Sequence, residues 1–205
     1  MNRTKRTRDM ILCAMFATLI SIGAFIKIPI PVVPFTLQYL FTMLAGLLLG
    51  GKKGAFSVLI YILLGLAGLP VFAEGGGITY VLKPSFGYMP GFCLGAFVTG
   101  CIVEKKGVLS YKRLLAANFS GLFVVYAVGM AYYWMISTFY TGTGIGLWPL
   151  FLYCFLLAVP GDIVLCVVAA IMAKRLLPVF RNLGLSDKTG GIEYVGNNTV
   201  ERQNL

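Results

Sequence analysis

The sequence contains no histidine, and its five cysteines include no C-x-x-C pair. A zinc site or a haem attachment site therefore has no recognisable ligands, and we expect neither a metal nor a cofactor. Buried free cysteine behaves as a small apolar residue, so we interpret all five as packing residues. They all fall in apolar stretches, at Cys13, Cys93, Cys101, Cys154 and Cys166.

Charged side chains are scarce, at 12% of the chain, and only seven of the 205 residues are acidic. Hydrophobic residues make up 59%, and the mean hydropathy is +0.87. This composition provides too few polar groups to cover a protein surface in water, so lipid must be the solvent. It predicts an all-α integral membrane protein and excludes a soluble enzyme.

A nucleotide-binding loop is also missing. The stretch from Gly46 to Lys53 imitates the start of a P-loop, but Lys53 stands where Ser or Thr is required, and the segment ends a membrane helix. The chain therefore cannot hydrolyse ATP, and active transport would need a partner or an ion gradient.

Six apolar runs have lengths near the roughly 20 residues that cross a bilayer as a helix. We therefore predict six transmembrane helices. The runs are residues 10–26, 35–50, 55–72, 85–103, 114–141 and 147–173.

Basic residues predict the orientation of these helices, because Lys and Arg near helix ends stay on the cytoplasmic side. With six spans and both termini in the cytoplasm, 15 of the 17 basic residues fall on that side. Only Lys27 and Lys83 fall outside. The net charge of +10 thus reflects membrane topology, and no nucleic-acid partner is expected.

Two segments flank the membrane domain, which we place at residues 10–183. Residues 1–9 form a basic cytoplasmic N-terminus. Because the apolar run after them has no small-residue cleavage pattern, we interpret it as a retained helix rather than a signal peptide. Residues 184–205 are polar and are predicted to be a disordered cytoplasmic tail.

The two outer loops have unusual compositions. Residues 28–34 contain three prolines, which favour a stiff extended strip suited to a lid or a wall. Residues 69–80, here called the Gly-rich loop, include Gly75, Gly76 and Gly77. Glycine lets the backbone approach a ligand closely, although a flexible turn would also explain the composition.

Asp162 is the only acidic residue deep within a predicted span, in the sequence Pro160-Gly161-Asp162. A carboxylate in the membrane is costly, which favours a role in ligand binding. A second interpretation makes it a cap for a helix that restarts after a break. Helix breaks are also predicted at Gly87, Pro90, Gly91 and Gly95, and transporters build binding sites at such breaks.

Other side chains are candidates to line a cavity with Asp162, although each has a packing or interfacial role as its alternative. They are Gln38, Tyr88, Asn118, Tyr126, Tyr132, Tyr133 and Trp134. On the first helix, small residues four apart indicate a docking face for a partner helix, or else internal packing. These are Ala14 with Thr18 and Ala17 with Ser21.

Four ordered motifs together resemble the BioY family, across about residues 10–175. They are Ile28-Pro29-Ile30-Pro31-Val32-Val33-Pro34-Phe35-Thr36-Leu37-Gln38, Gly68-Leu69-Pro70-Val71-Phe72-Ala73 with its glycine run, Pro84-Ser85-Phe86-Gly87-Tyr88 and Pro160-Gly161-Asp162. The resemblance implies a biotin-binding S component of an energy-coupling factor (ECF) transporter. Such proteins are six-helix bundles of the bacterial cytoplasmic membrane that pair with a transmembrane coupling protein and two cytoplasmic ATPases.

The resemblance also implies an outward-facing site closed by the two outer loops. Asp162 would accept hydrogen bonds from the ureido N–H groups of biotin, and Lys83 or Lys27 would attract its carboxylate. Lys83 has alternative partners in Glu74 and in lipid headgroups. With the polar residues above, the substrate-binding candidates are Phe35, Gln38, Gly75, Gly76, Tyr80, Lys83, Tyr88, Asn118, Tyr126 and Asp162.

One position departs from the family pattern. The family often has a lysine three residues after this aspartate, whereas this chain has Leu165, so Asp162 lacks that ion-pair partner. Two functional alternatives stay open at this point. They are an autonomous biotin facilitator and an S component for another vitamin.

Overall fold

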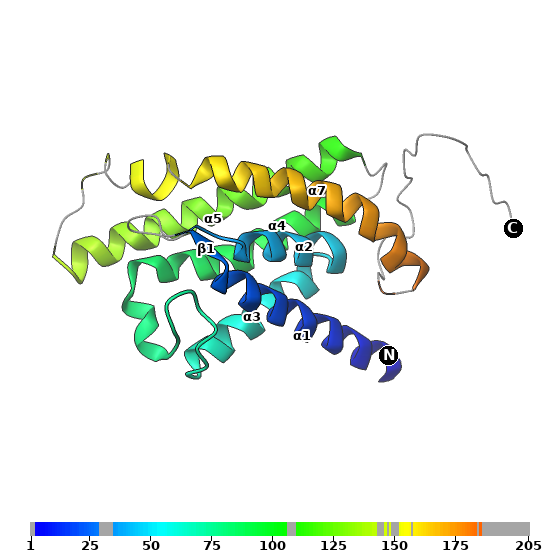
Figure 1. Cartoon of the computed structure of the whole chain (residues 1–205), viewed down its shortest axis with the longest axis horizontal. Coiled ribbons are helices and arrows are strands. Elements are labelled where there is room, and N and C mark those ends of the chain that lie inside the picture. Colours follow the sequence, from blue (N-terminus) through cyan, green and yellow to red (C-terminus); the bar gives the residue numbers. More distant parts are fainter. Residues whose placement is uncertain are drawn as a thin grey trace, which may run out of the picture.

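Helices dominate the computed structural model, which describes residues 3–28, 35–105, 110–142, 146, 148, 152–156, 158–183 and 185. Figure 1 shows them roughly aligned along the long axis of the molecule. The α-helices are α1 (Arg3–Phe25), α2 (Gln38–Leu49), α3 (Gly51–Leu66), α4 (Tyr88–Glu104), α5 (Tyr111–Phe139) and α7 (Val159–Asn182).

Short elements connect these helices. Strands β1 (Lys27–Ile28) and β2 (Phe35–Thr36) pair antiparallel, with Lys27 opposite Thr36 and Ile28 opposite Phe35. The 3₁₀ helices η1 (Ile78–Leu82) and η2 (Pro84–Gly87) lead into α4, and the π-helical turn η3 (Leu152–Leu156) precedes α7. The proline strip between the two strands and the tail beyond Leu185 lie outside the described residues.

Four helical segments within the described part of the chain are long and apolar enough to cross a membrane. A shorter apolar helix, α2, corresponds to the predicted run 35–50, which is the shortest of the six. The structure therefore supports a multi-pass helical membrane protein, and the count of six spans stays a prediction. The four segments are Arg3–Phe25, Pro84–Glu104, Tyr111–Phe139 and Val159–Phe180.

The breaks predicted at Pro90, Gly91 and Gly95 are wrong, because these residues lie inside α4, whereas the sixth predicted run does divide just before Pro160, between η3 and α7. Pro90 falls in the first turn of α4, which begins at Tyr88, and Pro160 is the second residue of α7. Proline is tolerated there because the first N–H groups of a helix have no intrahelical acceptor. Gly95 does not interrupt α4 either, and a Cβ there would meet Val125 and the Gly121 carbonyl of α5.

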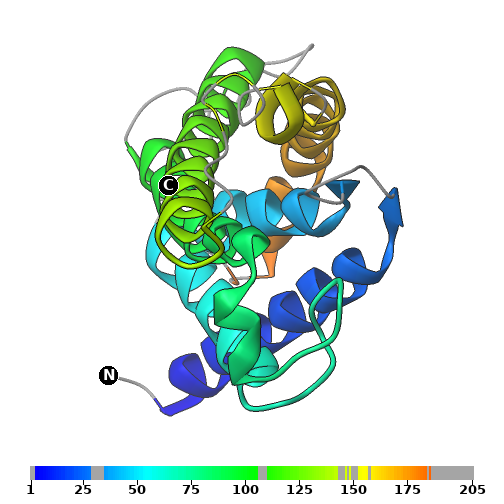
Figure 2. The same cartoon turned by 90° about the vertical axis from the view of Figure 1, so that its left-hand side faces the viewer.

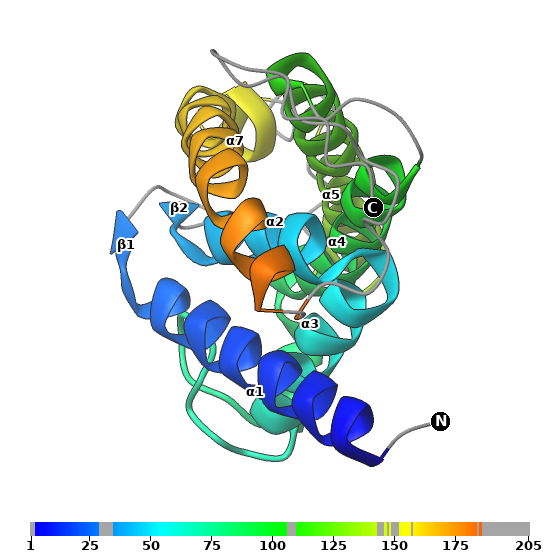
Figure 3. The same cartoon turned by 90° about the vertical axis from the view of Figure 1, so that its right-hand side faces the viewer.

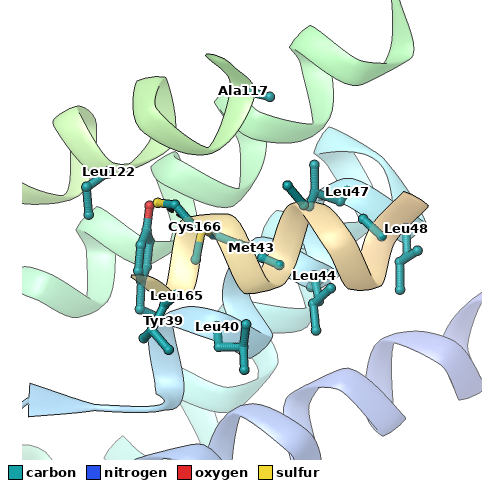
Figure 4. Packing of buried hydrophobic residues seen from close by; sticks show 14 of the residues in the cluster. Tyr39, Leu40, Met43, Leu44, Leu47, Leu48, Ala117, Leu122, Leu165 and Cys166 are labelled. Atoms are coloured by element: carbon teal, nitrogen blue, oxygen red, sulfur yellow. Dashed lines mark hydrogen bonds between the residues drawn. The ribbon is translucent and has the colours of Figure 1, made fainter. Parts of the chain in front are cut away.

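Helices α2 and α4 hold the bundle together. Helix α4 packs against α2, α3 and α5, while α1 packs against α2 and α3. Helix α7 packs against α2 and α5, so α2 separates α1 from α7 (Figure 3). Cluster residues of α2, including Met43, Leu44 and Leu47, fill the space between these neighbours (Figure 4).

Basic residues gather at one end of the bundle, which we call the basic end and define by Lys53, Arg113 and Lys174. Lys53 pairs with Asp9 of α1 at 2.8 Å. Arg113 donates to the carbonyls of Ile102 at 2.9 Å, of Val103 and of Lys105 at the end of α4. Lys174 lies 3.8 Å from the ring centroid of Tyr111. These contacts join α1 to α3, α4 to α5 and α5 to α7, and Figure 1 shows the start of α1 and the last turns of α7 at the same end.

The opposite end holds the β1–β2 hairpin, the Gly-rich loop and η1, and we call it the cavity end (Figure 2). Lys27 Nζ of β1 donates to the Ala73 carbonyl of the loop at 2.8 Å. The two basic residues that depart from the charge pattern, Lys27 and Lys83, thus both lie at this end.

Candidate functional site

A cavity opens at the cavity end, with an empty volume of about 660 Å³ that includes its mouth. A concave, mostly apolar lining with a few polar groups is typical of small-molecule sites, so the cavity suits a ligand of that class. Its walls are mostly apolar and aromatic. The lining residues are Phe35, Thr36, Gln38, Tyr39, Ala73, Tyr80, Ser85, Tyr88, Met89, Phe92, Val125, Tyr126, Ala158 and Asp162.

Asp162 provides the acidic side chain of this lining, and it lies in the first turn of α7. It is 9% exposed, and its Oδ2 accepts a hydrogen bond from the Tyr126 hydroxyl at 2.5 Å. A carboxylate has several lone pairs, so one bond from Tyr126 leaves acceptor capacity for a ligand. The position also suits a helix N-terminus, where the macrodipole favours negative charge. Binding and stabilisation of the helix start are therefore compatible.

Aromatic rings hold Tyr126 and form the walls around it. Tyr126 packs edge-to-face against Tyr88 at 6.0 Å between centroids and against Phe155 at 5.2 Å. Tyr39 stacks on Phe92 at 6.0 Å. Such pairs place flat apolar surfaces with fixed orientation around the cavity.

Glycine permits two of these walls to come close. A Cβ at Gly161 would overlap the Phe35 ring, so glycine lets the hairpin reach the first turn of α7 beside Asp162. A Cβ at Gly129 would likewise collide with the Tyr88 ring. The motif Pro160-Gly161-Asp162 therefore lies at the start of α7 and also leaves space for the Phe35 ring in the cavity wall.

The Gly-rich loop is a folded structure fixed by Phe72, which is fully buried. Its ring contacts Tyr61 at 5.4 Å and Tyr80 at 4.6 Å between centroids, and it fills the space that a side chain at Gly65 would need. Phe72 and Gly75 exchange backbone hydrogen bonds, and Gly75 has a φ of 110° that favours glycine. The glycines therefore shape the loop, and Ala73 and Tyr80 are its cavity-lining residues.

Both cations of the cavity end bind protein groups. Lys83 pairs with Glu74 at 2.8 Å and lies 4.8 Å from the ring centroid of Tyr80. Burial raises the pKa of the Tyr80 hydroxyl, which stays protonated at neutral pH. Neither Lys27 nor Lys83 lines the cavity, but each contacts a lining residue.

Six of the ten predicted substrate-binding residues line this cavity: Phe35, Gln38, Tyr80, Tyr88, Tyr126 and Asp162. Gly75, Gly76 and Lys83 lie in the adjoining loop region instead. Asn118 is fully buried away from the lining, and its Nδ2 donates to the Cys166 carbonyl of α7 at 2.8 Å. Its amide therefore joins α5 to α7, which is a packing role.

The other lining residues escaped sequence reasoning. Thr36, Tyr39 and Ser85 belong to or adjoin motifs that resemble the BioY family, so their place in the sequence could have predicted that they line the cavity. Met89, Phe92, Val125 and Ala158 have the composition of ordinary core residues, and no sequence signal separates them from packing. Tyr132 and Trp134 do not line the cavity, and Tyr132 donates to the Val81 carbonyl of η1.

The predicted docking residues on α1 fall on two faces. Ala14 and Thr18 are exposed, whereas Ala17 is 2% exposed within the bundle and Ser21 is intermediate. The Ala17 side chain therefore packs internally, which is the alternative that the spacing left open.

Comparison with models of protein families gives one match over most of the chain. The model described as "BioY family" matches residues 1–182, which include every element of the cavity. The chain belongs to the BioY family. Its resemblance to that family, first seen in four short motifs, therefore extends over the whole described bundle.

Named relatives agree with this assignment. The probable biotin transporter BioY of Lysinibacillus sphaericus is 44% identical over 182 residues, covering 89% of this chain and 93% of that protein. The biotin transporter BioY of Thermotoga maritima is 39% identical over 175 residues, covering 82% of this chain and 95% of that protein. These relatives are transporters, so the interpretation that excludes an enzyme is confirmed.

A solved structure has the same fold. The crystal structure of the S-component for biotin from an ECF-type ABC transporter matches with a TM-score of 0.65 and 28% identity, over 86% of this chain and 94% of that one. The Leu165 side chain, at the position where the resemblance implies a lysine, is 7% exposed in the hydrophobic core.

Proposed function

We propose that this chain captures biotin in the cavity and serves as the S component of an ECF-type ABC transporter. The observation that supports this most is an aromatic cavity containing Asp162 in a member of the BioY family. The relatives named as biotin transporters and the fold shared with a biotin S-component point to the same ligand.

The ligand chemistry fits the lining. Biotin has a ureido group with two N–H donors and one carbonyl, an apolar bicycle with an alkyl chain, and a carboxylate. We assign the ureido N–H groups to Asp162, because a buried carboxylate forms strong charge-assisted hydrogen bonds. The Tyr126 hydroxyl keeps that carboxylate oriented. Tyr39, Tyr88 and Phe92 provide flat surfaces for the apolar part.

The biotin carboxylate would lie toward the mouth of the cavity. Lys83 is the better candidate to attract it, since this lysine lies over Tyr80 of the lining and is partly exposed. Glu74 competes for the same ammonium group. Lys27 is assigned to holding the loop through the Ala73 carbonyl.

We further propose a cell-membrane topology of six spans, with the basic end in the cytoplasm. Helices α2 and α3 would then complete the set of four long apolar segments. The clustering of Lys53, Arg113 and Lys174 at the basic end supports this orientation through the positive-inside rule. The cavity would face outward.

The partners would be a transmembrane coupling protein and two cytoplasmic ATPases, since the chain has no nucleotide-binding motif of its own. On α1, the exposed residues Ala14 and Thr18 form the part of the predicted face that is available for docking. Thr18 Oγ1 already donates to the Ala14 carbonyl at 3.0 Å, so a partner helix would meet a small surface with its hydroxyl satisfied.

Two measurements test this function. Protein purified in detergent should retain biotin, identified by mass spectrometry, and should bind it in preference to thiamine or riboflavin. In proteoliposomes, uphill biotin uptake should require the coupling protein, the ATPases and ATP. Retention of another vitamin would contradict the ligand, and uphill uptake by the chain alone would favour the autonomous facilitator.

A further inference from the structure

Two buried polar atoms beside the cavity have no hydrogen-bond partner among the described residues. They are Nε2 of Gln38 and the hydroxyl of Tyr61. Gln38 is 3% exposed and Tyr61 is fully buried. Buried polar groups are normally paired, so two such atoms in one region call for a physical explanation.

These two atoms belong to neighbouring side chains. Gln38 begins α2 and lines the cavity, whereas Tyr61 lies on α3 behind it and is not part of the lining. The Gln38 amide lies near the Tyr61 hydroxyl, but the two groups do not meet in hydrogen-bond geometry in this structure. The ring of Tyr61 is held by the edge-on Phe72 ring, 5.4 Å away between centroids.

The orientation of the amide decides which atoms are satisfied. A glutamine amide can turn by 180° with almost no change in shape, which exchanges its oxygen and its nitrogen. If Nε2 faces Tyr61, the hydroxyl hydrogen of Tyr61 stays unpaired. If Oε1 faces Tyr61, that hydrogen is accepted, and both N–H bonds of the amide are directed away from α3, toward the cavity.

We propose that Tyr61 donates its hydroxyl hydrogen to Gln38 Oε1 and thereby presents the Gln38 amide N–H to the cavity as the donor for the ureido carbonyl of the ligand. This assignment rests on the proposed function. Asp162 supplies only acceptors and suits the ureido N–H groups, so the carbonyl needs a donor from elsewhere in the lining. Tyr61 is then a positioning residue, and Gln38 determines specificity.

Iminobiotin tests the assignment, because a protonated C=N group replaces the carbonyl and turns the acceptor into a donor. The informative quantity is the ratio of the dissociation constants of iminobiotin and biotin, since the contribution of Asp162 is shared by all variants. Relative to the unaltered protein, Gln38→Glu should lower this ratio by about tenfold or more. The amide N–H and the protonated C=N group of iminobiotin are both donors, whereas the introduced carboxylate accepts from that group.

Tyr61→Phe should lower the same ratio severalfold, because the released amide can then offer either its oxygen or its nitrogen to the ligand. Tyr111→Phe at the basic end removes a hydroxyl far from the cavity and should leave the ratio unchanged. Gln38→Met, which removes the donor and keeps the side-chain length, should weaken biotin binding more than iminobiotin binding. It replaces Gln38→Glu if that variant does not fold.

The outcomes separate this inference from the proposed function. If the unaltered protein binds biotin but the ratio is the same in the Gln38 variants and in Tyr61→Phe, the inference is overturned and the function stands. If the unaltered protein binds no biotin, both are overturned. A lower ratio in the Gln38 variants with an unchanged ratio in Tyr61→Phe would overturn the positioning role of Tyr61.

Discussion

At the basic end of the bundle, Asp9 of α1 is paired with the cation of Lys53 at 2.8 Å, whereas at the cavity end Asp162 of α7 is bound by the hydroxyl of Tyr126. The first carboxylate has its charge compensated and joins two helices. The second has a neutral partner and keeps hydrogen-bonding capacity. The same residue type therefore joins two helices at one end and keeps acceptor capacity in the cavity lining at the other.

The forces that hold the two ends also differ. Contacts of charged side chains and helix-end carbonyls dominate the basic end. Arg113, for example, donates hydrogen bonds to carbonyl groups in the last turn of α4. Aromatic rings dominate the cavity end, where Phe72 is buried between Tyr61 and Tyr80. Aromatic rings give the cavity end a mostly apolar lining, which suits a ligand with an apolar part.

Removing the central ring of the cavity end should have the largest effect. Phe72→Ala deletes a fully buried aromatic side chain and should cost about 3–5 kcal/mol of stability. Thermal unfolding in detergent and biotin dissociation rates measure the outcome. Phe56→Ala is a matched control, since Phe56 is 50% exposed on α3. Equal effects of the two changes would contradict the anchoring role of Phe72.

The aspartate comparison predicts the next largest effect. Asp162→Asn should weaken biotin binding by about 1.5–3 kcal/mol, because a charge-assisted hydrogen bond is lost. Asp9→Asn should leave binding unchanged. Isothermal titration of both variants measures the difference. Full affinity in Asp162→Asn would reduce this residue to stabilising the start of α7.

A smaller effect is expected from the Lys53–Asp9 pair, whose side chains are each 26% exposed. Asp9→Asn should lower stability by about 1 kcal/mol or less, because partly exposed ion pairs contribute little. The loss should shrink as salt rises. Thermal unfolding at low and high ionic strength measures it. A salt-independent loss would show that packing around α1, rather than charge, joins the helices here.

The smallest effects should come from the Lys83–Glu74 pair at the mouth, which is 42% exposed. Glu74→Gln frees Lys83 to attract the ligand carboxylate and should strengthen biotin binding severalfold at low salt, without strengthening binding of biotin amide. Lys83→Met should weaken biotin binding by a similar factor. If both variants bind biotin as the unaltered protein does, the mouth has no electrostatic role in binding.

Much of the fold could be predicted from the order of apolar and charged residues along the chain. Apolar runs predict long helices because a bilayer leaves few other solutions for the backbone. The charge asymmetry predicts the clustering of Lys53, Arg113 and Lys174 at one end. The interpretation of Pro90 as a helix break was wrong, because proline is also tolerated in the first turn of a helix, whereas the break predicted beside Pro160 corresponds to the division between η3 and α7.

The sequence by itself determined the class of protein, the long helices, the basic end and the motif that contains Asp162, since these depend on composition and order along the chain. Only the tertiary structure decided which side chains share the cavity. It placed Gln38, Tyr126 and Asp162 in one lining, directed Asn118 to α7 and turned Ala17 inward. The physical reason is that the rotation of a helix about its axis is set by packing against residues distant in sequence.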